Sequence, residues 1–144
     1  MLSLHELRFL CMESLKRKPT FRALLQAAAI YDKEAMALLF YNAEYSLSAF
    51  VKVIKNETMV TADEEQSIIT TIKNEAAPSA LHLLRWLCIT KSALSRELEK
   101  AGLNLELLLK QINILIMTVQ KNNVLFSDSS NENPLTNLSK CRFN

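Results

Sequence analysis

Apolar residues recur every three or four positions along most of this chain, which is the spacing of one face of an α-helix. In the first such stretch Leu4 and Leu7 share a face, and the stretch stops before Pro19, which disrupts a helix interior. Two further stretches, 21–30 and 80–89, are so apolar that they lack a clean polar face. Helices of that kind are buried, so both are predicted at the centre of the fold.

Residues with short polar side chains mark where most of these helices begin, because their oxygens accept an otherwise unpaired backbone N–H. The residues predicted to open helices are Thr20, Asp32, Ser46, Thr61, Ser79, Ser92 and Asn104, in addition to Ser3 or His5 at the start. The sequence thus predicts eight helices, the first ending at Arg17 and the last at about Lys121. Residues 56–60 form the connector between the two halves.

The second half of the chain repeats the first. Residues 19–25 read Pro-Thr-Phe-Arg-Ala-Leu-Leu, and residues 78–84, 59 positions later, read Pro-Ser-Ala-Leu-His-Leu-Leu. Further on, Tyr-Ser-Leu at 45–47 is matched by Leu-Asn-Leu at 103–105, now 58 positions later. A duplicated helical unit that carries few catalytic residue types favours a recognition module over an enzyme.

The repeat sets the expected organisation of the chain. We expect an all-α fold in which two four-helix repeats, 3–56 and 61–121, pack around a pseudo-two-fold axis as one domain, 1–121. Residues 122–144 are predicted to be a linker, since 127–134 is polar and ends in a proline. The chain looks as if it continues into a further module.

Composition supports a helical protein and excludes some functions. The chain has one glycine, three prolines and 49% hydrophobic residues, which favours helices over strands and tight hairpins. A formal charge of +2 does not indicate a nucleic-acid partner, and the one basic run, 16–18, fits the end of the first helix. The apolar stretch 112–119 is interrupted by Asn113 and is far too short to span a membrane.

Cysteine usage bears on the compartment. Cys11, Cys88 and Cys141 are odd in number and have no metal-site spacing, so we expect buried thiols in a reducing compartment. The prediction is a cytoplasmic protein, with an organelle stroma as the alternative.

Side chains that carry chemistry are few. His82 is expected to be structural, and Trp86 is expected in the core, since both lie among leucines on an apolar helix. The acidic run 63–65 is interpreted as solvated acids at a helix N-terminus, where negative charge is favoured, instead of a metal site. We therefore predict no enzymatic activity, no metal and no cofactor.

The second copy resembles the repeat of the Clp N-terminal domain. The resemblance rests on residues 81–87, which read Leu-His-Leu-Leu-Arg-Trp-Leu, and on residues 92–108, which contain Gly102 followed by Leu-Asn-Leu-Glu-Leu-Leu. The first copy matches at 23–25 and 45–50, and the tail 137–144 is similar to the segment that joins that domain to an ATPase module. The chain departs from the family pattern by lacking the usual Gly-His loop. Arg22 and Leu81 also stand where the family has glutamate.

The resemblance implies the N-terminal domain of a Clp-type unfoldase or disaggregase, which binds unfolded or tagged substrates or adaptor proteins and delivers them to the ATPase ring. It implies no nucleic-acid or membrane partner, a monomer for this domain and a hexamer for the parent. By position it places an apolar binding groove at Leu81, Ile68, Ile72 and Leu4. Ordinary core packing is the competing interpretation for all four.

Two other classes of protein stay open. A freestanding helical adaptor or interaction module without an ATPase would show the same duplication. A death-domain-like or virulence-related helical interaction protein would lack the pseudo-two-fold axis that relates 3–56 to 61–121. An enzyme is the third class, which the scarcity of clustered polar residues disfavours.

Overall fold

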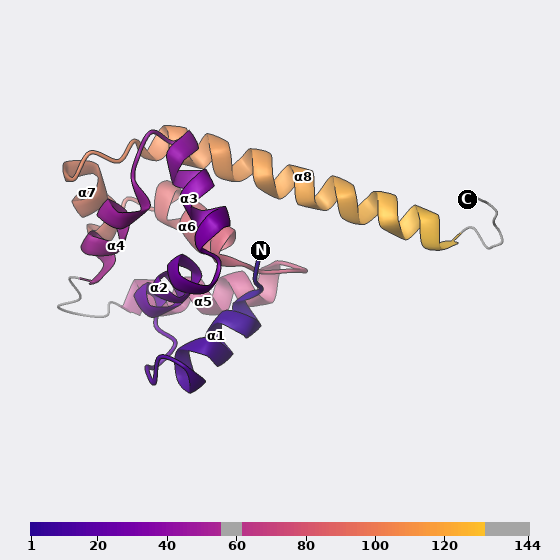
Figure 1. Ribbon diagram of the computed structural model, residues 1–144, viewed down its shortest axis with the longest axis horizontal. Coiled ribbons are helices and arrows are strands. Elements are labelled where there is room, and N and C mark those ends of the chain that lie inside the picture. The colour runs from indigo at the N-terminus through magenta and orange to yellow at the C-terminus, as the bar shows by residue number, and fades with distance from the viewer. Residues whose placement is uncertain (56–61, 132–144) are drawn as a thin grey trace. The chain divides into compact units, whose positions relative to one another are not determined.

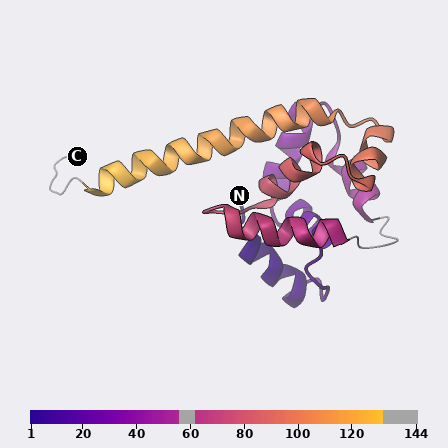
Figure 2. The same ribbon diagram turned by 180° about the vertical axis from the view of Figure 1, so that it is seen from behind.

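The chain forms eight helices in the computed structural model, which describes residues 1–55 and 62–131, with side chains for 1–55 and 64–118 (Figures 1 and 2). In order they are α1 (Leu4–Glu13), α2 (Phe21–Tyr31), α3 (Lys33–Asn42), α4 (Leu47–Lys55), α5 (Ala62–Asn74), α6 (Ala80–Ile89), α7 (Ala93–Lys100) and α8 (Leu105–Asn131). No strand occurs in the described ranges, where the β-type pairing is a single bridge between Ser3 and Ser79. The all-α prediction is confirmed.

Two helix ends differ from the prediction. α1 ends at Glu13 and not at Arg17, because Lys16 has a φ of 55°, a left-handed conformation that a right-handed helix cannot include. α8 continues to Asn131, so residues 122–131 of the predicted linker are helical. Their polar composition lowers helix propensity, but they contain no glycine or proline to end the helix. The predicted linker residues 132–144 and the connector 56–60 lie outside the described residues.

The chain divides into two compact units, Met1–Ile112 and Asn113–Asn144. The first unit contains α1 to α7 and the start of α8, so most of both predicted repeats fold together. The second unit begins within α8.

α2 occupies the centre of the first unit. It contacts α1, α3, α4, α5 and α6, and every residue from 21 to 29 is buried. Ala23, Ala27 and Ala28 leave room for these neighbours to approach closely, since alanine is the smallest side chain that still favours a helix. The Phe21 ring meets the Trp86 ring edge-on at a centroid distance of 5.2 Å, which joins α2 to α6.

The turns after α3 and α7 have the same hydrogen bonds. In the first copy Glu44 N–H donates to the Tyr41 carbonyl, and Tyr45 N–H donates to the Phe40 carbonyl, both at 2.9 Å. The same two bonds recur 58 residues later, at Gly102 and the residue after it, with both lengths 3.0 Å. Each turn places one residue in the left-handed region, Glu44 at φ 59° and Gly102 at φ 106°.

Most of the predicted N-caps are confirmed. The side chains of Thr20, Ser46, Ser79, Ser92 and Asn104 each accept a backbone N–H in the first turn of the following helix. Asp32 is the exception, because its side chain makes no cap bond to α3 and instead accepts the Leu2 N–H at 2.8 Å. Thr61 lies outside the described residues.

Candidate functional site

The four predicted binding residues lie on α1, α5 and α6. Leu4 is 0% exposed, Leu81 4% and Ile68 8%, whereas Ile72 is half-buried. The starts of α1 and α6 are joined, since Leu4 N–H donates to the carbonyl of Pro78 at 3.0 Å, and α5 contacts α6. Burial of this degree is what core packing alone would give. A binding role for these residues stays a prediction.

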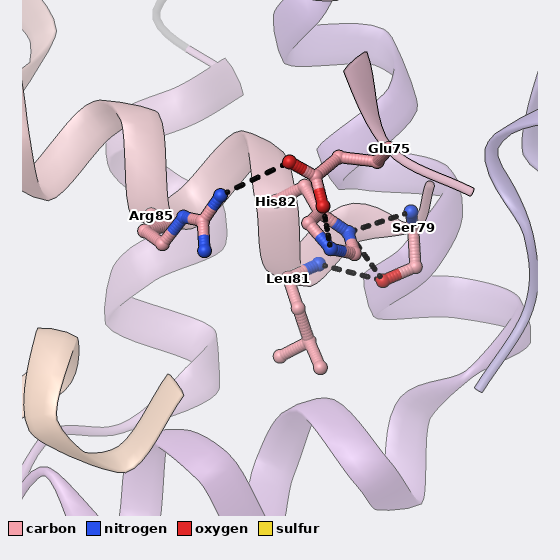
Figure 3. Close-up of polar contacts among 5 residues, drawn as sticks. All are labelled: Glu75, Ser79, Leu81, His82 and Arg85. Carbon is pink, nitrogen blue, oxygen red and sulfur yellow. Dashed lines mark hydrogen bonds and ion pairs between the residues drawn. The ribbon is translucent and has the colours of Figure 1, made fainter. Parts of the chain in front are cut away.

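A polar cluster lies at the start of α6 (Figure 3). Leu81 N–H donates to Ser79 Oγ at 3.2 Å, and Ser79 N–H donates to His82 Nδ1 at 3.1 Å, which is a reciprocal capping arrangement. Glu75 reaches the cluster from just beyond α5, with Oε1 3.3 Å from His82 Nε2 and Oε2 3.3 Å from Arg85 Nη2. The Leu81 side chain points away from these polar groups.

His82 is held as a neutral imidazole. Burial lowers the pKa of His82 from its ordinary 6.5; the Glu75 carboxylate acts to raise it and the Arg85 guanidinium to lower it. The Ser79 N–H points at Nδ1, which requires that nitrogen to be unprotonated. Both ring nitrogens therefore have partners, Nδ1 as an acceptor and Nε2 as a donor, as expected for the structural histidine that the sequence predicted.

A small hollow of about 190 Å³ lies beside this cluster. Glu75, His82, Arg85 and Trp86 line part of it. Trp86, predicted in the core, is half-buried: it packs on Phe21 and also borders this hollow. Because the polar side chains here bind one another, the cluster holds the start of α6 in place and offers no unengaged acid or base.

An ion pair between Arg22 of α2 and Glu64 of α5 is buried in the first unit. Arg22 Nε lies 3.5 Å from Glu64 Oε1, and the two side chains are 7% and 4% exposed. The interpretation of residues 63–65 as solvated acids is therefore wrong for Glu64, although Glu65 is exposed; the side chain of Asp63 lies outside the described residues. Glu64 is buried because α5 packs against α2, and the sequence around residues 63–65 does not indicate that contact.

An open groove lies between α2, α3 and α4, three helices of the first unit. Its volume is about 700 Å³. We call it the α2–α4 groove; it is lined by Gln26, Ala29, Ile30, Lys33, Ala37, Leu47, Ser48, Val51, Lys52 and Lys55. The floor is mainly aliphatic and the rim carries lysines, so the groove can hold apolar side chains in a positively charged setting.

No protein-family model, no curated protein and no solved structure matches the chain.

Sequence reasoning did not find the α2–α4 groove. One sequence feature could have indicated the groove. In α4 the apolar pair Leu47 and Val51 stands beside Lys52 and Lys55, and this pattern gives the helix separate apolar and basic faces. Lys33 belongs to another helix, and only the packing of α3 and α4 on α2 brings it to the same rim.

The described cysteines are buried, as predicted. Cys11 Sγ donates to the carbonyl of Ala23 at 3.3 Å, and burial raises the pKa of Cys11. Burial also raises the pKa of Cys88 to about 12, so neither thiol is an activated nucleophile. Cys141 lies outside the described residues.

Among the side chains that the structure describes, no group of three or more His, Cys, Asp or Glu is arranged to hold a metal ion. None of the helices in the described ranges is both long enough and apolar enough to cross a membrane.

Proposed function

We propose that this chain is a recognition domain that binds exposed apolar segments of other proteins. The observation that carries the proposal is the α2–α4 groove, an open site of about 700 Å³ with an aliphatic floor in a compact helical unit. Surfaces that bind peptides commonly present apolar pockets between helices, which accept side chains from an extended or helical partner.

We further propose that the parent protein is a Clp-type ATP-dependent chaperone or unfoldase. In this role the domain takes unfolded or tagged substrates, or adaptor proteins, and delivers them to an ATPase ring without hydrolysing ATP itself. The domain is a monomer by itself and the parent is a hexamer, in the cytoplasm or an organelle stroma. The matching turns after α3 and α7 support the duplication on which the Clp resemblance rests.

Binding to an unfolded protein tests the recognition role. Fluorescently labelled, reduced and carboxymethylated α-lactalbumin is a suitable probe because it stays unfolded and exposes apolar segments. We expect saturable binding by fluorescence anisotropy, and we expect Val51→Asp, which puts a charge on the apolar lining, to weaken it at least about tenfold. Leu38→Asp is the matched control, since Leu38 is 60% exposed and lies outside the groove.

The outcome distinguishes the groove from the surface that the resemblance implies. If Leu81→Gln weakens binding and leaves the thermal melt unchanged, the site lies at the start of α6 and not in the α2–α4 groove. Because Leu81 is 4% exposed, we expect this variant to lower the melting temperature instead, which would withdraw Leu81 from the site. Absence of saturable binding by the wild-type domain would refute the recognition role.

A freestanding adaptor is the second candidate, because the α2–α4 groove by itself requires no ATPase. The coding sequence downstream of this chain distinguishes the freestanding adaptor from the unfoldase. A Gly-x-x-x-x-Gly-Lys-Thr/Ser motif in the same reading frame would favour the unfoldase, since that loop cradles nucleotide phosphates.

A further inference from the structure

Three lysines line the α2–α4 groove, and none of them has an ion-pair partner among the described residues. The three are Lys33, Lys52 and Lys55, and no acidic side chain is among the described lining residues. Asp32, next to Lys33, directs its carboxylate to the Leu2 N–H at 2.8 Å.

Helix stability explains only part of this arrangement. Lys52 and Lys55 lie in the last turn of α4, where positive charge is favoured by the helix dipole. Lys33 is the first residue of α3, at the end of a helix where positive charge is disfavoured. Lys33 lies at the same groove as Lys52 and Lys55, although its position on α3 does not favour a positive charge.

The floor between these lysines is shaped for aliphatic groups. Ala29 and Ala37 leave space between the helices, while Leu47, Val51 and the 55%-exposed Ile30 supply apolar surface. The volume of about 700 Å³ lies within the range of about 300–1,000 Å³ that is typical of ligand sites. It accommodates a few side chains of a peptide and is too small for a folded domain.

We propose that the α2–α4 groove selects short apolar segments flanked by aspartate or glutamate. The aliphatic side chains of the segment occupy the floor, and its carboxylates lie against Lys33, Lys52 and Lys55 at the rim. This inference rests on the proposed recognition function and specifies its substrate class. Charge complementarity at the rim fixes which apolar segments bind, because a lysine-flanked segment meets like charge at the same positions.

Three synthetic peptides with one shared apolar core test the selectivity. The core is flanked by glutamates, by glutamines or by lysines, and binding is measured by fluorescence anisotropy at low and high salt. We expect the glutamate peptide to bind about fivefold or more tighter than the glutamine peptide, and the lysine peptide to bind most weakly. The preference should shrink at about 1 M salt, where the Debye length is about 3 Å.

Two double variants that each remove two positive charges test whether the groove lysines cause the preference for the glutamate peptide. Lys52→Gln combined with Lys55→Gln should bring the affinity for the glutamate peptide down to that for the glutamine peptide, which removes the preference. Lys73→Gln combined with Lys91→Gln removes the same charge from exposed positions outside the groove and should leave the preference intact. Circular dichroism of each variant verifies the helical fold.

Each outcome decides one of the two proposals. If no peptide binds, the recognition function itself fails. If the three peptides bind equally, or if both double variants behave alike, the inference is refuted while the recognition function stands. Concentration-dependent dimers in analytical ultracentrifugation that Val51→Asp abolishes would show a second copy in the groove, which would also refute the inference.

Discussion

The helices α2 and α6 lie at corresponding positions in the two predicted repeats, but their surroundings differ. Every α2 residue from 21 to 29 is buried, whereas α6 leaves His82, Arg85 and Trp86 half-buried. The residue types of the two helices differ in the same way as their burial. Alanines in α2 stand at the positions that correspond to His82 and Trp86, because an enclosed helix needs small residues and a partly open one has room for large ones with polar tips.

One local feature is common to both helices. In α2 Gln26 accepts a hydrogen bond from Arg17, which precedes the helix, and in α6 the equivalent Arg85 donates to Glu75, which also precedes its helix. The residue types differ, but in both cases a side chain within the helix binds a side chain of the segment before it.

The largest expected effect comes from making α2 resemble α6 at Arg22, whose counterpart is Leu81. Arg22→Leu leaves Glu64 buried beside an apolar side chain and should lower the free energy of unfolding by about 3–5 kcal/mol. Adding Glu64→Leu should recover most of that loss, since a buried ion pair is often replaceable by apolar residues. Urea unfolding followed by circular dichroism measures both; a single variant as stable as the wild type would refute the structural importance of the pair.

A smaller effect is expected at the matching turns. Gly102 has a φ of 106°, and a Cβ there would come no closer than 3.9 Å to Tyr45 Cε1, so Gly102→Ala strains the backbone without a clash. We expect a loss of about 1–2 kcal/mol. Glu44→Gly, at φ 59°, should gain about 0.5–1 kcal/mol by removing the same strain from the first copy.

Thermal unfolding measures both turn variants, and Glu44→Ala is the control because it retains the Cβ. Equal behaviour of Glu44→Gly and Glu44→Ala would show that backbone strain is not what distinguishes the two turns.

The smallest effect concerns the acid sensitivity of α6, since α2 has the non-titrating Ala23 where α6 has His82. The pKa of His82 is lowered from 6.5 in the folded state, so the unfolded state binds the proton more readily below that pH. Stability should be full above pH 6.5 and fall as the pH decreases, by no more than about 1.4 kcal/mol per pH unit. His82→Gln should flatten this dependence, measured as the urea midpoint against pH.

His5→Gln is the control for that measurement, because His5 is exposed on α1. If both histidine variants flatten the curve equally, the burial of His82 is not the cause.

The sequence predicted most helix starts correctly, whereas the binding role of Leu4, Ile68, Ile72 and Leu81 stays a prediction. Caps such as Ser79 and the break before Pro19 act within a few residues, so the pattern alone located the starts of α2 and α6. The predicted end at Lys121 was wrong because polar composition does not by itself stop a helix. For the predicted site, the sequence could not distinguish exposed from buried leucines, and the structure buries Leu4 and Leu81.

What the sequence determined by itself is local: the all-helical class, most helix starts and the left-handed position that Gly102 fills. These features depend on hydrogen bonds and steric limits between neighbours along the chain. Tertiary structure alone decided that Glu64 is buried against Arg22 and that Lys33 joins Lys52 at one rim. Both depend on which helices pack together, and burial and charge environment are properties of that packing.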